Sequence, residues 1–272
     1  MSQNAQKMSW AAAVAKRAGV QADKVEEVLA KHRIQPSPTA AAPRRLSLTE
    51  IRFAGKKDGG ANPGQFQFQF QWKDLDHGLW AMVSDSNLKG KSSVIEIVRW
   101  LLRGRPSDNL QEDVKRWISE ASVGFRLDES HFIVRLNSVT SAGTLKEMKA
   151  GGKENLLASF ETANDFESVM ADFFLKAFSL ECVTVWRDGS DDVPGQAVVH
   201  SWPAMSGVMF IGTDYASLLG DLPPTSGLPI RLMQMYLGLP WISTLTAAKA
   251  APRVRTREIE ARERRRTAAA AS

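Results

Sequence analysis

The stretch "SDSNLKGKSSVIEIVRWLLRG", Ser84 to Gly104, decides the expected fold. A Gly-Lys-Ser-Ser motif runs directly into a segment whose apolar residues recur at helical spacing. Those residues are Val94, Ile95, Val98, Leu101 and Leu102. The apolar run "GLWAMVSD" comes just before the motif and predicts a buried strand. A buried strand, a short loop and a helix in this order are typical of a phosphate-binding loop.

The motif has the residue types that phosphate binding requires. Backbone N–H groups of such a loop surround phosphate oxygens, and the positive end of the following helix faces them. Lys91 would neutralise the outer phosphates, and the hydroxyl of Ser92 would bind Mg²⁺. The predicted cofactors are therefore ATP and Mg²⁺. The predicted nucleotide-binding residues are Ser86, Asn87, Leu88, Lys89, Gly90, Lys91, Ser92 and Ser93.

Asp85 departs from the pattern, because the first loop glycine normally stands there. Aspartate tolerates unusual backbone angles, but its carboxylate would repel phosphate if it pointed inward. Three interpretations therefore stay open. The loop is a working nucleotide site, a degenerate loop that does not hydrolyse, or a chance GKSS between a strand and a helix.

The surrounding sequence predicts a mixed α/β body. "LSLTEIRFAG" and "GQFQFQFQW" alternate as strands do, and the second places Phe66, Phe68, Phe70 and Trp72 on one face. A hairpin is predicted over "EASVGFRLDESHFIVRLNS", and a helix over "NDFESVMADFFLKAF". Further strands are predicted at "AGTLKEM", "NLLASFE", "ECVTVWR", "QAVVHSWP" and "GVMFIGT". A helix at "SDNLQEDVKRWI" is predicted to begin at Ser107 or Asp108.

Composition divides the chain into four parts. Residues 1–34 predict a small two-helix module, and the proline-rich residues 35–45 predict a linker. Residues 46–246 form the expected main lobe. Residues 247–272 are rich in alanine, arginine and glutamate and predict a basic helical tail, expected to begin a coiled coil.

The charge of the chain is concentrated in that tail. The formal net charge of the 272 residues is +5. The segment Lys249–Arg266 holds eight basic and three acidic residues, so the rest of the chain is balanced. The body is therefore not predicted to be a nucleic-acid surface. One cysteine and four histidines argue against a disulfide framework and a zinc site, and the single cysteine favours a cytoplasmic protein. No apolar run in the sequence is long enough to predict a membrane span.

The motif and its flanks resemble the N-terminal half of Rad50/SMC-like ATPases. Asn87, Gly90, Lys91, Ser92 and Ser93 match a GxNGxGKSS loop, while Asp85 and Leu88 replace two of its glycines. Glu96 and the ending "WLLRG" match the helix that follows such a loop. The resemblance implies an α/β P-loop NTPase lobe with a β-rich subdomain. The resemblance covers roughly Leu46 to Ala270 and is weak after the P-loop helix.

The resemblance also implies functional residues and partners. Gln234 takes the place of the Q-loop glutamine, which helps to bind Mg²⁺ and the attacking water. Lys56 or Lys57 matches a basic residue near the phosphates. The signature motif and the Walker B acid are missing, and "GVMFIGTD" ending at Asp214 is only the nearest match. The resemblance thus implies a fragment that binds ATP, needs a second head for hydrolysis and acts on DNA.

Other features of the sequence allow both functional and structural interpretations. A non-enzymatic adaptor with a degenerate P-loop is the alternative function. "VAKRAGVQADKVEEVL" is similar to a helix-turn-helix, but Asp23, Glu26 and Glu27 would face DNA badly. His77 could be a ligand or a base, but a turn histidine is the simpler interpretation. Asp188, Asp191 and Asp192 could bind a cation, but solvated loop residues are the simpler interpretation. The phenylalanine strip is interpreted as core, and the tail as a solvated helix that could contact DNA without sequence preference.

Overall fold

The computed structural model describes residues 3–58, 65–75, 78–83, 85, 90–189, 194–210 and 227–271. The chain forms two compact units. We name Pro43–Phe178 with Val208–Phe210 the sheet unit, and Met1–Ala42, Ser179–Gly207 and Ile211–Ser272 the helical unit. The expected main lobe, 46–246, is thus shared between the two units. Each unit is described by itself below.

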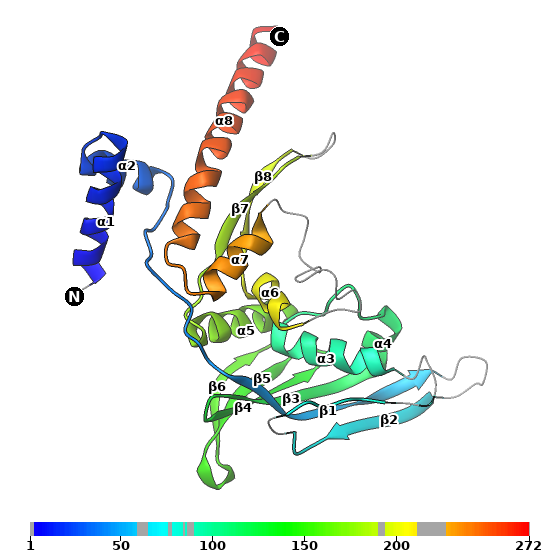
Figure 1. The fold of residues 1–272 in the computed structure, drawn as a ribbon. Coiled ribbons are helices and arrows are strands. Elements are labelled where there is room, and N and C mark those ends of the chain that lie inside the picture. The colour runs from blue at the N-terminus through cyan, green and yellow to red at the C-terminus, as the bar shows by residue number, and fades with distance from the viewer. Residues whose placement is uncertain are drawn as a thin grey trace. The chain divides into compact units, whose positions relative to one another are not determined.

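The sheet unit is built on a six-stranded antiparallel sheet with strand order β2-β1-β3-β4-β5-β6 (Figure 1). A mixed α/β fold is therefore confirmed. The strands match the predicted ones closely. They are β1 (Leu46–Asp58), β2 (Gln65–Trp72), β3 (Ile118–Leu127), β4 (Ser130–Asn137), β5 (Gly143–Met148) and β6 (Glu154–Phe160).

The phenylalanines of β2 lie on the face of the sheet that forms the core. Phe70 pairs with Phe53 of β1, and their rings stack with centroids 4.8 Å apart. Phe53 is 8 % exposed, whereas Phe66 near the start of β2 is 56 % exposed. The core interpretation of the strip is confirmed for Phe68 and Phe70, which contact Phe53. Base stacking on this face is correspondingly disfavoured.

Helices cover one face of the sheet (Figure 1). They are α3 (Lys91–Arg103), α4 (Glu112–Trp117) and α5 (Ala163–Ala177), and a 3-10 turn, η1 (Ala150–Gly152), joins β5 to β6. Phe125 of β3 is fully buried and contacts Phe174 of α5, with ring centroids 5.5 Å apart. On the opposite face Arg52, Glu120 and Arg135 are exposed. The core therefore lies between one sheet face and the helices.

The predicted apolar face of α3 is correct except at one position. Val94, Val98, Leu101 and Leu102 are buried, but Ile95 is 52 % exposed and Ile97 is buried instead. The stripe Val94, Ile97, Val98 and Leu101 follows the i, i+3, i+4, i+7 spacing of a helix packed on a core. Ile95 falls about 100° away from Val94 around the helix axis, outside that stripe.

Two further local predictions were wrong. The helix α4 begins after Gln111, not at Ser107 or Asp108, because Ser107 is buried and its hydroxyl donates to Glu96. The strand predicted from Gly207 is absent over its described part. A 3-10 turn, η2 (Ser206–Met209), stands there, and it continues directly from the buried helix α6 (Trp202–Met205).

The helical unit contains the other elements. They are α1 (Gln3–Ala18), α2 (Ala22–Lys31), β7 (Val183–Arg187), β8 (Gln196–His200), α6, α7 (Leu228–Tyr236) and α8 (Ile242–Ala271). The strands β7 and β8 form an antiparallel hairpin. Gly19 has a positive φ of 68° and follows the last residue of α1, where a helix end was predicted. The tail helix α8 begins five residues earlier than predicted and continues through Pro252.

A polar cluster around Glu181 ties the predicted linker to the start of α8. One carboxylate oxygen accepts hydrogen bonds from the hydroxyls of Ser37 and Thr39, and the other from Ser243 at 2.5 Å. Thr244 extends the cluster, because its Oγ1 accepts from the backbone N–H of Ser37 at 3.0 Å. The linker is therefore held by specific hydrogen bonds.

The same hydroxyls determine the ionisation of Glu181. Burial by itself would raise the pKa of this carboxyl, but the hydrogen bonds from Ser243, Ser37 and Thr39 lower the pKa below its ordinary value of 4.5. A lowered pKa means that folding favours the charged form. This contribution to stability is fully present when the pH is above the ordinary pKa, and it is lost as the pH falls through the pKa of the folded state.

We predict that Glu181→Gln lowers the free energy of unfolding at pH 7 by about 1–2 kcal/mol, because a charged acceptor is lost. The difference from the wild type is expected to shrink as the pH falls below 4.5. Urea unfolding at several pH values measures it. The exposed Glu161→Gln variant is the control. A difference that does not change with pH would contradict the prediction.

A second prediction concerns Gly104, which ends α3 with a positive φ of 84°. A Cβ there would lie 2.7 Å from the Cα of Glu167 in α5. Gly104→Ala should therefore destabilise the sheet unit through both backbone strain and a steric clash. The control Gly151→Ala has a similar φ of 76° and open space around its Cβ.

We expect Gly151→Ala to cost about 1–2 kcal/mol, the strain of a left-handed residue. Gly104→Ala should cost about 1–3 kcal/mol more, because overpacking adds to that strain. Denaturant unfolding of both variants gives the two values. Equal losses would show that the contact between Gly104 and α5 is not tight.

Candidate functional site

The described part of the predicted phosphate-binding loop is the start of α3. Gly90 is the N-cap residue and adopts the left-handed conformation, with φ 79° and ψ 12°. A Cβ at Gly90 would meet nothing within 4 Å, so the backbone angle, not space, requires glycine there. The backbone N–H of Val94 donates to the carbonyl of Gly90 at 3.2 Å and closes the first turn of the helix.

The N-terminal end of α3 has the electrostatics of an anion site. The N-cap residue Gly90 provides no side-chain cap, and no acidic residue lies in the first turn of α3. Lys91 and Ser93 are half-buried, and Ser92 is exposed. The partial positive charge of the helix end is therefore joined by the Lys91 ammonium and the hydroxyl of Ser92. These residues fit the phosphate and Mg²⁺ of a nucleotide.

The remaining loop residues are described only in part. Ser86, Asn87, Leu88 and Lys89 lie outside the described residues. Asp85 is described and exposed to solvent. The structure thus brings Gly90, Lys91, Ser92 and Ser93 together through α3, and the other predicted contacts stay predictions.

The buried strand predicted before the loop is wrong for its described residues. Residues 78–83 have no strand conformation, and Leu79 is 99 % and Val83 86 % exposed. Trp80 is half exposed and contacts Trp72 edge to face, with ring centroids 5.9 Å apart. The apolar character of this segment misled the prediction, because no described strand of the antiparallel sheet pairs with it.

A buried ionic group behind the loop was missed by the sequence analysis. Arg99 is only 3 % exposed, and its guanidinium lies 3.7 Å from the carboxylate of Glu96. The ring of Phe210 lies 5.4 Å from the same guanidinium, and Ser107 donates a hydrogen bond to Glu96. The sequence did contain a signal for this group, because Glu96 and Arg99 stand about one turn apart in an otherwise apolar helix. The group fixes α3 against its surroundings.

Gln234, the predicted Q-loop residue, lies on α7 of the helical unit and is half-buried. Its Oε1 accepts a hydrogen bond from Nη1 of Arg231 at 2.7 Å. This oxygen is the atom that would bind Mg²⁺. A neighbouring guanidinium is unfavourable to a cation, so Gln234 in this arrangement does not fit a metal site.

The other candidate residues have structural surroundings. Lys57 lies over the ring of Trp117, 4.8 Å from its centroid, while Lys56 is exposed. Asp188 pairs with Arg253 at 3.2 Å. His77, Asp191, Asp192 and Asp214 lie outside the described residues. Among the residues that the structure describes, no cluster of histidine, cysteine and acidic side chains could hold a metal ion.

The helix α2 has an acidic exposed face. Asp23, Glu26 and Glu27 of α2 are exposed, so this face of the helix is acidic, as expected. Within the described ranges, every helix is too short or too polar to cross a bilayer.

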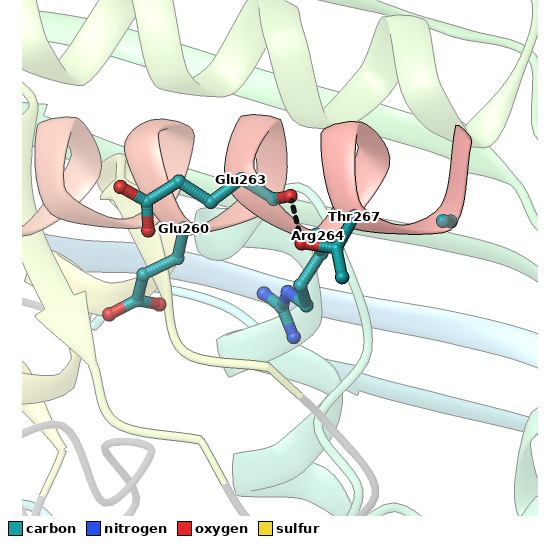
Figure 2. A pocket seen from close by; sticks show the side chains of 5 residues that line it. Glu260, Glu263, Arg264 and Thr267 are labelled. Atoms are coloured by element: carbon teal, nitrogen blue, oxygen red, sulfur yellow. Dashed lines mark hydrogen bonds between the residues drawn. The ribbon is translucent and has the colours of Figure 1, made fainter. Parts of the chain in front are cut away.

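Two of the hollows on the helical unit are lined by described residues. The first has only α8 as its wall, and Figure 2 shows Glu260, Glu263, Arg264 and Thr267 on it. The second, of about 570 Å³, lies between α1, α2 and the start of α8 and is almost entirely apolar. Trp10 and Trp241 stack at its side, with ring centroids 5.1 Å apart. A hollow with one wall does not enclose a ligand, whereas the second is of ligand size.

Comparison of the chain with known protein families and with curated proteins found no match.

Proposed function

We propose that this chain is the ATP-binding half of a Rad50/SMC-like P-loop ATPase that acts on DNA. The observation that carries the proposal is the start of α3. A left-handed glycine, a lysine and two serines follow one another at a helix end whose N-cap residue has no side chain and whose first turn has no acidic residue. Such an end attracts anions, and lysine and serine are the residues that suit a phosphate and its Mg²⁺.

Each residue has a separate role in the proposal. The backbone N–H groups after Gly90 hold phosphate oxygens, Lys91 neutralises their charge, and the exposed hydroxyl of Ser92 reaches the metal ion. ATP would supply the phosphoanhydride bond whose cleavage drives the cycle. The buried Arg99 and Glu96 are positioning residues, because they fix the helix that carries Lys91 and Ser92.

The exposed segment before the loop supports a two-part enzyme. Leu79 and Val83 are almost fully exposed, although large apolar side chains in such a run are usually buried. In the proposed enzyme, a complementary half would pair with this segment and supply the missing acid and signature motif. A second ATPase head, from that half or from another copy, is therefore the proposed partner.

Gln234 enters the proposal only after a rearrangement. Its Oε1 would have to leave Arg231 before it could contact Mg²⁺ or water. In the proposal, ATP binding by the single chain depends on the start of α3. Gln234 would contribute only after two ATPase heads have come together.

The alternative is a non-enzymatic adaptor with a degenerate loop. The apolar hollow beside Trp10 and Trp241 favours it, because exposed apolar surface of this kind suits protein partners. The two functions differ in their response to nucleotide: the adaptor is indifferent to MgATP, and the ATPase half is stabilised by it.

We predict that MgATP raises the melting temperature of the wild-type chain and does so far less in Lys91→Ala. A ligand at about 100 times its Kd stabilises the folded state by about 2.7 kcal/mol, which corresponds to several degrees. Differential scanning fluorimetry with and without MgATP measures the shift. Lys153→Ala, at an exposed turn, is the control and should respond like the wild type. No shift in the wild type at millimolar MgATP would sink the ATPase proposal.

We also predict that Asp85→Gly strengthens MgATP binding. Asp85 is exposed and stands at the first glycine position of the motif, so in the proposed site its negative charge would repel the phosphates. Removing about 1 kcal/mol of such repulsion corresponds to a roughly fivefold lower Kd. Isothermal titration calorimetry measures the Kd. Asp85→Asn removes the charge without adding the backbone freedom of glycine, so it separates the two effects. If both variants bind MgATP more weakly than the wild type, the carboxylate of Asp85 helps binding and the prediction is wrong.

A further inference from the structure

The strand β2 is an edge strand of the six-stranded sheet, with β1 as its neighbour (Figure 1). Its pairing with β1 is regular from Gln65 opposite Asp58 to Trp72 opposite Ile51, without a register shift. Among the residues that the structure describes, no backbone group pairs with the outer side of β2. Such an edge exposes a row of N–H and C=O groups that can pair with another strand.

The sequence of β2 lacks the features that usually protect an edge strand. Natural edge strands often carry charged side chains, a proline or a β-bulge, each of which disfavours pairing with a further strand. The eight residues "QFQFQFQW" contain neither a charge nor a proline, and the regular register with β1 excludes a bulge. The outer side of β2 is therefore suited to the addition of a strand.

The opposite edge strand of the sheet, β6, does have such protection. It begins with Glu154, which forms ion pairs with Arg135 at 2.6 Å and with Lys146 at 2.7 Å. A register shift in its pairing with β5 leaves Leu157 without an opposing residue in β5. Because β6 has both a charge and a bulge, strand addition is expected at β2 and not at β6.

The apolar face of β2 extends past the helices that cover the sheet. The main contacts of α3, α4 and α5 with the sheet are to β1, β3, β4 and β6. Phe68, Phe70 and Trp72 are half-buried, and Phe66 is 56 % exposed. A strand added to β2 would place its own side chains beside this aromatic row. An apolar face on the added strand would remove further apolar surface from water.

We propose that β2 pairs with β2 of a second copy of this chain, antiparallel, about a two-fold axis at Phe68. With this axis, Phe66 lies opposite Phe70 of the second copy. Gln67 lies opposite Gln69 in the same way. Opposite residues of an antiparallel pair share one face of the sheet, so phenylalanine meets phenylalanine and glutamine meets glutamine. The strict alternation of β2 therefore makes the strand complementary to itself.

The lack of charge on β2 favours a second copy over an unrelated strand. A two-fold axis places residues of the same strand opposite one another, so that like charges near the axis would repel. An unrelated partner is usually selected by complementary charges, and β2 offers none. The pairing also ends at two copies, because both β2 strands are then used and the remaining edges are the protected β6 strands.

This inference goes beyond the proposed function and needs no nucleotide. Engagement of two ATPase heads depends on MgATP, whereas pairing of two β2 strands does not. Association that appears only with MgATP would support head engagement and contradict the β2 dimer. A dimer that forms without nucleotide, in a chain whose melting temperature does not respond to MgATP, would support the β2 dimer and count against the ATPase.

Sedimentation equilibrium of the full chain without nucleotide, over a series of protein concentrations, tests the proposal. The mass of the wild type should approach twice the 30.0 kDa of one chain as the concentration rises. Gln67→Lys with Gln69→Lys places like charges opposite each other across the axis and should raise the dissociation constant roughly tenfold. Both glutamines are exposed, so the sheet unit should stay folded, which circular dichroism checks.

A mixture of charge variants separates lost pairing from lost folding. Gln67→Glu with Gln69→Glu should also dimerise weakly by itself. An equimolar mixture with the lysine variant should form a dimer again, because opposite charges then face each other across the axis. A misfolded β2 would not be rescued in this way, and absence of rescue would overturn the proposal.

The matched control is Leu157→Lys with Ser159→Lys, which adds the same charge to exposed positions of β6. This variant should dimerise like the wild type. Loss of the dimer in the control would assign the interface to β6 and overturn the proposal. A wild type that stays monomeric at every concentration, or that grows beyond two copies, would also overturn it.

Discussion

Burial of the apolar stripe of α3 is the interaction on which the candidate site depends. Val94, Ile97, Val98 and Leu101 are each no more than 6 % exposed, and α3 as a whole contacts β3, β4 and α5. This packing determines where the first turn of the helix lies, and hence where Gly90, Lys91 and Ser92 are placed. Gly104 at the other end allows α5 to approach within contact distance, so both ends of α3 are constrained.

The chain has two anion-attracting features that differ in kind. At α3 the charge comes largely from backbone N–H groups and the helix dipole, which have a defined direction and select a small, geometrically suited group. At α8 it comes from guanidinium groups on the long, flexible side chains of an exposed helix, which have no fixed direction. The two features lie in different compact units, and each can be disrupted without the other.

The spacing of apolar residues predicted secondary structure correctly where one face of an element packs on the core and the other faces solvent. The alternation in β2 and the hairpin of β3 and β4 were predicted correctly for this reason. Prediction failed where burial depends on distant partners. The apolar segment 78–83 was predicted to be a buried strand and is exposed, and Ile97 rather than Ile95 faces the core. Arg99 shows the opposite case, a charged residue that is buried because Glu96 and Phe210 surround it.

The sequence by itself determined most elements of secondary structure, the position of the glycine, lysine and serines at the start of α3, and the concentration of charge in the tail. These are local properties, since spacing and residue type govern backbone conformation and amphipathicity. Only the tertiary structure decided that the sheet is a six-stranded antiparallel one, that Leu79 and Val83 are exposed, and that Glu181 joins the linker to the start of α8. Those outcomes depend on contacts between residues far apart in the chain, and such contacts are not encoded in a short window of sequence.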